Sequence, residues 1–147
     1  MRHLLLFCLA AALLLAADPW SDREVVAPEA LAKDLKKPLV LHVGFNVLYR
    51  AAHIKGTPYA GPASKPEGLA ELKKAVSGQP LDRDIVLYCG CCPMDKCPNL
   101  RPAFTALHEM GFKNVRVLSL PDNLKTDWID KGYPTDKRSS PAGPTEK

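Results

Sequence analysis

The sequence has almost no cysteine outside one short stretch. Of its five cysteines, Cys8 stands alone and the other four lie between Cys89 and Cys97, in the segment CGCCPMDKC. Disulfides usually stabilise a chain by joining distant positions, which a cluster this short cannot do. The pattern therefore argues against a structural disulfide framework and for a chemical role of the cluster.

No apolar run is long enough to cross a bilayer as a helix. The longest, from Leu4 to Ala17, has 14 residues, whereas a spanning helix needs roughly 20. It follows Arg2 and ends on small residues, which is the pattern of a secretory signal peptide. We predict that 1–17 is this signal peptide, which removes Cys8 and leaves no stable membrane insertion. The mature protein is then exported, either to the periplasm or as a secreted protein.

Clusters of like charge are also lacking. Without Arg2, which leaves with the signal peptide, the chain has 19 basic residues (20 minus one) against 16 acidic ones, and the two signs are interspersed. This distribution predicts no nucleic acid partner. The 130 residues that remain (147 minus 17) have the size of one domain.

What the sequence does contain is an alternation of apolar runs and amphipathic segments. Nearly continuous apolar runs predict three buried strands, PLVLHVGF at 38–45, DIVLYC at 84–89 and NVRVLSL at 114–120. Apolar residues at helical spacing, with proline and glycine at the ends, predict four helices, over 28–35, 68–78, 99–111 and 123–134. A segment rich in proline and glycine, 56–68, predicts a loop.

Strands that alternate with helices predict an open α/β fold, a parallel sheet flanked by helices in a single domain. We place this domain at 38–134, after an N-terminal extension with a short helix at 18–37 and before a polar tail, 135–147, which we expect to be disordered. Ligands of such sheets bind beyond the carboxyl ends of the strands. The cysteine segment lies there, between Tyr88 and the helix that begins near Pro102.

The position of Cys89 favours a nucleophile. It is the first residue past a predicted strand, where backbone N–H groups and the start of a helix stabilise a thiolate. Lys96 and Arg101 lie in or beside the same loop, and either cation could lower a thiol pKa or bind an anionic substrate.

The same thiols also suit a metal site. Cys89 and Cys92 have the spacing of a zinc half-site, and Cys91 and Cys97 would complete four sulfur ligands, while fewer would hold Cu(I). Structural zinc sites usually draw their ligands from two separated segments, and no histidine lies within this loop. The metal site is therefore an alternative hypothesis.

A third hypothesis is a dithiol redox protein, because CGCC follows a strand and precedes a helix as in thioredoxin-type oxidoreductases. Those proteins begin the helix within the motif, whereas Pro93 and Pro98 keep this segment irregular. A disulfide between Cys92 and Cys97 is compatible with a nucleophilic Cys89.

Three separated stretches together resemble the rhodanese-like domain. VLHVGFNVLYRAAHIKGTPYAG resembles the first signature of that family through the turn from His53 to Gly56, and IVLYC with the next helix and GFKNVRVLSL resembles its active-site unit. WIDKGYP is similar to its closing element, from Trp128 to Pro134. The resemblance covers 38–134, nearly all of the predicted mature chain.

The resemblance implies a sulfurtransferase without a cofactor. Cys89, by its position after IVLY, takes a sulfane sulfur from a small donor such as thiosulfate or a persulfide, and then carries it as a persulfide to a thiol or to cyanide. We expect Cys91, Cys92 and Cys97 to be relay, resolving or ligand thiols. In two places the sequence departs from the family pattern. His42 and Gly44 replace the usual aspartate and arginine of the first strand, and the loop after the cysteine is enlarged.

Three histidines and two aromatic residues are expected to have structural and not catalytic roles. We expect His42 to be a satisfied core histidine or to support the site from behind its first layer of residues, His53 to fix its turn by hydrogen bonding, and His108 to be solvated. Trp128 and Tyr133 are expected to pack in the core and not to bind substrate.

Overall fold

A computed structural model describes residues 20–137 of the chain. The predicted signal peptide, Cys8 and the tail residues 138–147 lie outside the described residues. The helices and strands are, in order, β1 (Val25–Val26), α1 (Pro28–Lys33), β2 (Leu39–His42), α2 (Asn46–Ala51), β3 (Ala52–Ile54), α3 (Pro66–Ala75), β4 (Asp84–Tyr88), the 3-10 turn η1 (Met94–Lys96), α4 (Leu100–Glu109), β5 (Asn114–Leu118), the π-helix η2 (Lys125–Ile129) and β6 (Thr135–Lys137). None of the helices in 20–137 is long and apolar enough to span a bilayer.

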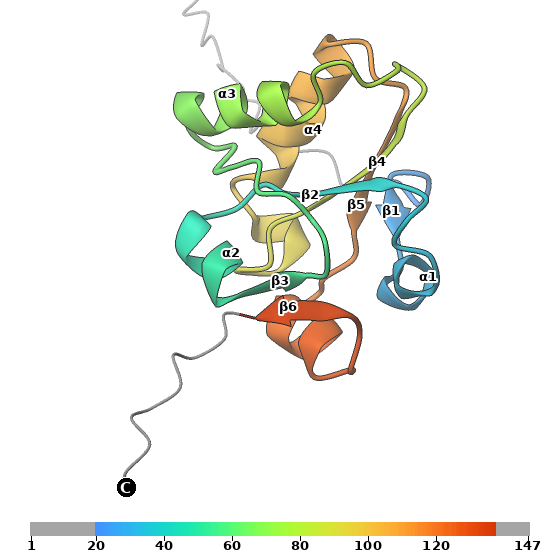
Figure 1. The fold of residues 1–147 in the computed structure, drawn as a ribbon, viewed down its shortest axis with the longest axis vertical. Coiled ribbons are helices and arrows are strands. Elements are labelled where there is room, and N and C mark those ends of the chain that lie inside the picture. The colour runs from blue at the N-terminus through green and yellow to red at the C-terminus, as the bar shows by residue number, and fades with distance from the viewer. Residues whose placement is uncertain (1–19, 138–147) are drawn as a thin grey trace, which may run out of the picture.

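The centre of the molecule is a parallel sheet with the strand order β1-β5-β4-β2 (Figure 1). In the middle strand β4, Val86 pairs with Val40 of β2 on one side and with Arg116 of β5 on the other. Because β4 has a neighbour on each side and a covered surface on each face, its residues from Ile85 to Tyr88 are all buried. This explains why its sequence is a continuous apolar run without alternation. The predicted α/β fold is confirmed.

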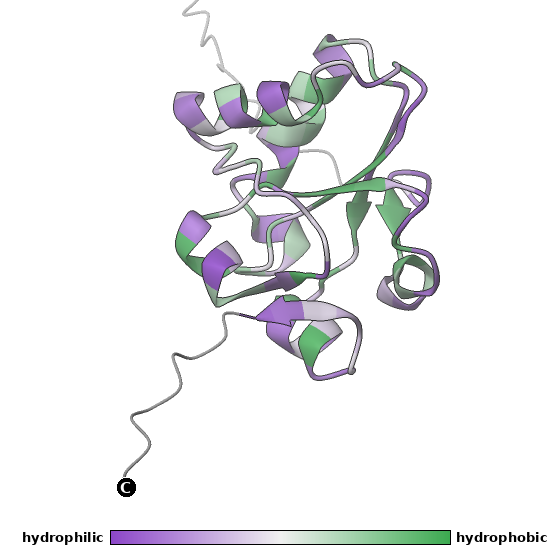
Figure 2. Ribbon diagram, viewed as in Figure 1, coloured by the Kyte–Doolittle hydropathy of each residue, from purple (hydrophilic) through white to green (hydrophobic). Residues whose placement is uncertain are grey.

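One face of the sheet is covered by α3 and α4, which lie together above the strands in Figure 1. Ile85 and Leu87 point to this side and belong to one apolar cluster with Leu72 of α3 and Leu107 of α4. Figure 2 shows the central strands as apolar, whereas polar and apolar residues alternate along α3. The two helices end near glycines with positive φ, Gly78 and Gly111, as the sequence predicts.

The other face is covered by α1, η2 and the small β3–β6 sheet. Val86 and Tyr88 point to this side and share a second apolar cluster with Leu31 of α1 and Trp128 of η2. The Tyr88 hydroxyl accepts a hydrogen bond from the backbone N–H of Ile54 at 3.0 Å, which ties β4 to β3. Since side chains alternate along a strand, β4 supplies both clusters.

The fold extends beyond the predicted domain boundaries in both directions. Val25 and Val26, in the predicted N-terminal extension, form β1, which pairs with Val117 and Leu118 of β5. Residues 135–137, predicted to begin a disordered tail, form β6, which pairs with β3 in the antiparallel sense. Each of the two strands has only two or three residues, too few for a recognisable alternation of polar and apolar side chains. They are strands because each pairs with a strand that is distant in sequence. The short helix α2 and the turn η1 also lack a sequence signal of their own.

Candidate functional site

The cysteine loop begins where the buried strand β4 ends, as the sequence predicts. Cys89 follows Tyr88 directly, and Gly90 then turns the chain with a φ of 85°. L side chains rarely adopt that backbone conformation, so glycine is required at this turn. The turn places Cys91 beside Cys89 at the carboxyl edge of the sheet, where ligands of open α/β folds bind.

Backbone hydrogen bonds hold the enlarged loop against the rest of the molecule. The carbonyl oxygen of Gly90 accepts from the N–H of Leu124 at 3.1 Å, and the N–H of Met94 donates to the carbonyl of Leu120 at 3.0 Å. Met94 is buried and begins η1, after which the chain reaches Cys97 and the first turn of α4. The extra residues therefore form a defined structure that brings a later cysteine back to the strand end.

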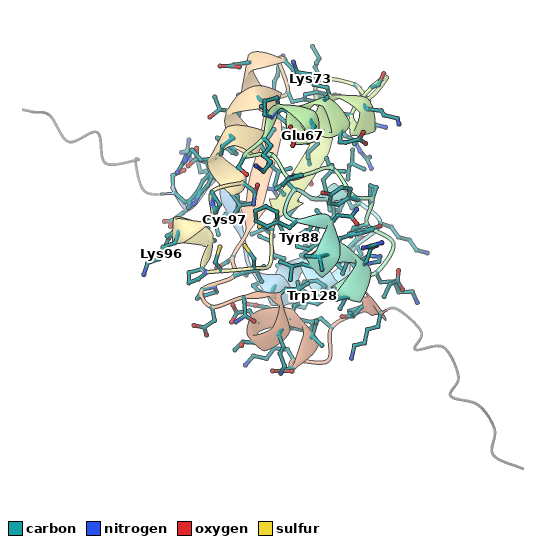
Figure 3. All side chains as sticks on the ribbon, turned by 90° about the vertical axis from the view of Figure 1, so that its left-hand side faces the viewer. Glu67, Lys73, Tyr88, Lys96, Cys97 and Trp128 are labelled. Carbon is teal, nitrogen blue, oxygen red and sulfur yellow. The ribbon has the colours of Figure 1, made fainter. Side chains whose placement is uncertain are left out.

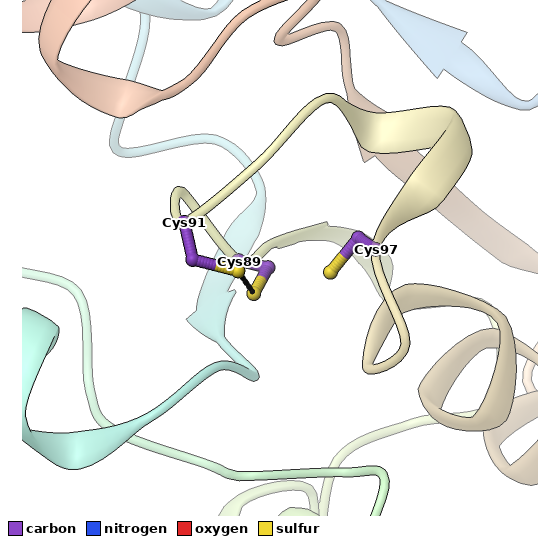
Figure 4. Close-up of side chains that lie close together, drawn as sticks. All are labelled: Cys89, Cys91 and Cys97. Atoms are coloured by element: carbon purple, nitrogen blue, oxygen red, sulfur yellow. Dashed lines mark hydrogen bonds between the residues drawn. The ribbon is translucent and has the colours of Figure 1, made fainter.

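The thiols of the loop converge on one point (Figure 4). The Sγ atoms of Cys89 and Cys91 are 3.2 Å apart, and those of Cys91 and Cys92 are 3.1 Å apart. The Sγ atoms of Cys89, Cys91 and Cys97 all lie within 4.8 Å of one another. All four residues are unpaired thiols; Cys89 and Cys97 are buried, Cys92 is half-buried and Cys91 is exposed.

The four thiols differ in their acidity because their surroundings differ. The pKa of Cys97 is lowered to about 6, first by the hydrogen bond from the Cys89 thiol and then by the backbone N–H groups of Asn99 and Leu100 at the start of α4. The pKa of Cys89 is raised well above its usual range by its hydrogen bond to Cys97 and by burial. Burial also raises the pKa of Cys92, to about 12. Of the two buried thiols, Cys97 is thus the one whose pKa is lowered. The predicted role of Cys89 as the nucleophile stays a prediction.

Asn99 is a site residue that sequence reasoning did not identify. It is fully buried, its Nδ2 donates to the Sγ of Cys89 at 3.5 Å, and its Oδ1 accepts from the backbone N–H of Ser64 at 3.0 Å. Asparagine directly before a helix usually indicates a helix cap. Here Asn99 precedes α4 but makes no capping bond with its side chain, which links the cysteine loop to the loop before α3 instead.

The glycine that departs from the family pattern lies against the nucleophile candidate. A Cβ atom at Gly44 would lie 2.6 Å from the Sγ of Cys89 and 2.9 Å from its backbone oxygen. Since the second contact is with backbone, any side chain at this position would displace the end of β4. Position 44 therefore accommodates glycine, because Cys89 fills the space that a side chain would need.

His42 lies behind the site, in the core, as predicted. Its Nδ1 accepts a weak hydrogen bond from the N–H of Gly44 at 3.3 Å, whereas its Nε2 has no hydrogen-bond partner among the described residues. Rings of Tyr49, Tyr59 and Tyr88 surround it. Burial lowers the pKa of His42 to about 4, so the ring is neutral near pH 7. The expectation that its polar atoms are all satisfied is wrong at Nε2.

The other histidines have the predicted structural roles. His53 donates from Nδ1 to the backbone oxygen of Tyr49 at 2.8 Å and stacks on the Tyr49 ring, which fixes its turn. His108 is exposed on α4 and packs on Phe104. Trp128 is fully buried, as expected of a core residue.

The two candidate substrate-binding cations, Lys96 and Arg101, have different surroundings. Lys96 is exposed on η1, and Figure 3 shows it at the edge of the molecule, with Cys97 further inside. The guanidinium of Arg101 stacks on the ring of Trp20, 3.5 Å from its centroid. The predicted role of Lys96 and Arg101 in binding an anionic substrate stays a prediction.

Comparison with known proteins identifies the fold through structure and not through sequence. No family model matches the chain, and no curated protein matches it. Among solved structures, the rhodanese-like domain of the Alr3790 protein from Anabaena is 23% identical, with a TM-score of 0.57, and the match covers 84% of this chain and 89% of that domain. The BH2092 protein from Bacillus halodurans is 15% identical with a TM-score of 0.61, and the match covers 79% of this chain and 78% of the other.

A third similar structure contains a persulfide. It is a variant of EanB with a cysteine persulfide, in a tetrahedral intermediate state with ergothioneine. The match is 21% identical with a TM-score of 0.57, and it covers 76% of this chain but 27% of EanB.

Proposed function

The chain has the rhodanese-like fold, and from this premise we propose that it is a sulfurtransferase that carries sulfane sulfur as a persulfide on Cys89. The observation that carries the proposal is the position of Cys89 at the carboxyl end of β4, with a second thiol, Cys97, close to its sulfur. EanB, part of which is similar in structure to this chain, carries a persulfide on a cysteine, and this supports the proposal.

In the first step Cys89 attacks the outer sulfur of a small donor. With thiosulfate, the Cys89 sulfur forms a bond to the outer sulfur, the S–S bond of the donor breaks, and sulfite leaves with the electron pair. The thiol proton of Cys89 passes to the Cys97 thiolate, whose Sγ lies within 4.8 Å of the Cys89 sulfur. The pair thus supplies both the nucleophile and the proton acceptor, without a histidine in the loop.

In the second step the outer sulfur leaves Cys89. An acceptor thiolate, or cyanide, bonds to the outer sulfur, and the Cys89 sulfur departs as a thiolate that regains its proton from Cys97. The Nδ2 group of Asn99 and the N–H of Cys91 donate to the Cys89 sulfur and stabilise its charge during both steps. Cys91 is the exposed thiol of the cluster and is suited to relay sulfur to an acceptor in solution.

The remaining predictions are part of the same proposal. Lys96 attracts the anionic donor to the loop, and small molecules, not nucleic acids, are the partners. Export through the signal peptide at 1–17 places the reaction in the periplasm or outside the cell.

Intact mass spectrometry tests the proposal. The reduced protein is incubated with thiosulfate under anaerobic conditions, desalted and weighed, and we expect the mass to increase by one sulfur atom. Cys89→Ser should abolish this gain, whereas the matched control Cys92→Ser should keep it, because the Cys92 sulfur contacts Cys91 and lies outside the mutual group of Cys89, Cys91 and Cys97.

Two results would overturn the assignment. One is an added sulfur that survives Cys89→Ser with unchanged yield, which would move the persulfide to another thiol. The other is a parent protein that gains no sulfur atom; if it also reduces insulin disulfides, it is a dithiol oxidoreductase.

A further inference from the structure

The thiol cluster contains more soft ligands than the sulfur transfer uses. We propose that Cys89, Cys91 and Cys97 also form a three-sulfur binding site for Cu(I). Their Sγ atoms lie within 4.8 Å of one another, although the residues come from the end of β4, the Gly90 turn and the end of η1. This inference does not depend on the proposed sulfur transfer, although both use Cys89.

The spacing of the three sulfurs suits a trigonal site. With metal–sulfur bonds of about 2.3 Å, three sulfurs around one ion lie about 4 Å apart. Cys89 and Cys91 are 3.2 Å apart, so binding requires these two thiols to separate by less than about 1 Å. Both are next to Gly90, and the Cys91 side chain is exposed, so this movement meets no packed core on its side.

The ligand set favours Cu(I) over Zn²⁺. Thiolates are soft ligands that select Cu(I) as well as Zn²⁺, but structural zinc sites are almost always four-coordinate. The Cys92 sulfur contacts Cys91 and interacts with Cys97, but it does not lie within 4.8 Å of all three sulfurs, and in 20–137 no histidine or carboxylate joins them. Three sulfurs without a fourth ligand match the low coordination number of Cu(I).

The three-sulfur site is shielded from solvent at two of its ligands and open to solvent at the third. Cys89 and Cys97 are 1% and 8% exposed, which protects two of the ligands from solvent, whereas Cys91 is exposed and provides the route for the ion. The hydrogen bonds of Gly90 and Met94 hold the loop, so the ligands are positioned before the ion binds. Because the ion and the persulfide both need the Cys89 sulfur, bound Cu(I) blocks sulfur uptake.

Competition with a chromophoric chelator measures the binding. The reduced full chain is titrated anaerobically into the Cu(I)–bicinchoninate complex, and we expect removal of one Cu(I) per chain. Cys91→Ser and Cys97→Ser should each weaken the binding at least about tenfold, while the matched control Cys92→Ser should stay within about threefold of the parent. Circular dichroism of each variant verifies that it is folded. X-ray absorption at the copper edge should show three sulfur neighbours at about 2.3 Å.

Three outcomes would overturn the copper site: no removal of Cu(I) from the chelator, equal affinities for the parent and the folded Cys97→Ser variant, or a loss in Cys92→Ser as large as in Cys97→Ser. The proposed sulfur transfer fails separately, because its test uses metal-free protein and thiosulfate. A parent protein that gains no sulfur but binds one Cu(I) would leave the copper site standing, and the opposite result would leave the sulfurtransferase standing.

Discussion

The cysteines of the loop differ in acidity and exposure because each has different neighbours. Cys97 lies where two backbone N–H groups at the start of α4 stabilise a thiolate, whereas Cys89 is enclosed behind Gly44 and Asn99 and remains a thiol. Cys91, one turn away from Cys89, faces solvent. The acidity of each thiol is therefore set by its own neighbours, which for Cys97 are Cys89 and the first residues of α4.

At the same scale, His42 predicts a pH dependence of stability. Its pKa falls from an ordinary 6.5 to about 4 in the folded protein, so below pH 6.5 the unfolded chain binds a proton that the folded chain does not. The stability that neutral His42 contributes is complete above pH 6.5 and is lost as the pH falls toward 4. Over that window we expect a loss of roughly 3 kcal/mol from this residue.

Urea unfolding at pH 7 and pH 4.5 measures this contribution. The variant His42→Asn retains an acceptor for the N–H of Gly44 but has no titrating group. Its stability should fall less between the two pH values than that of the parent, by roughly 2 kcal/mol. Carboxylates titrate equally in both proteins, so they cancel in the comparison. An equal fall in the two proteins would show that His42 is protonated in the folded state.

At the scale of elements, short segments complete the fold around the longer ones. The β3–β6 sheet covers the second apolar cluster next to Trp128, and the loop from Cys89 to Asn99 closes the carboxyl edge of the main sheet. Each is held by backbone hydrogen bonds to a distant part of the chain. The cysteine loop is therefore as much a part of the fold as the strands on which it rests.

Truncation tests the role of β6. A chain that ends at Pro134 loses the strand pairing with β3 and the hydrogen bond from the Gly56 N–H to Asp136, at 2.8 Å. We expect it to be destabilised by roughly 1 to 3 kcal/mol, the net worth of a few exposed hydrogen bonds. A chain that ends at Lys137 keeps β6 and is the matched control. Equal melting curves for the two truncated chains would show that β6 does not contribute to stability.

At the scale of the whole molecule, the sheet connects the two apolar clusters, which lie on its opposite faces. Because neighbouring residues of β4 point to opposite faces, neither cluster can lose its packing without disturbing the strand that supplies the other. We infer that the domain unfolds as one cooperative unit.

The two tryptophans of the chain report separately on the two faces. Trp20 packs edge-on against Phe104 beside the first cluster, with ring centroids 5.2 Å apart, and Trp128 lies in the second cluster. Trp20→Phe and Trp128→Phe therefore leave one fluorescent reporter each. In both variants the fluorescence and circular dichroism transitions in urea should have the same midpoint. Separate midpoints within one variant would show that the two faces unfold independently.

The sequence by itself determined the fold class, the three longer strands of the sheet, the end of β4 as the place of the site, and the cluster of thiols there. These features are local, since continuous apolar runs, helix-ending glycines and the spacing of cysteines can be recognised within a few positions. The resemblance to the rhodanese-like domain rests on the same kind of short motif.

Only the tertiary structure decided what lies against the Cys89 sulfur, why a side chain at position 44 would clash, what Asn99 contacts, and where β1 and β6 pair. Each depends on a contact between segments far apart in the chain: Gly44 against Cys89, Asn99 against Ser64, and β1 and β6 against their partner strands. Hydrogen bonds and close packing act over a few ångströms, and the folded chain alone determines which residues come within that reach.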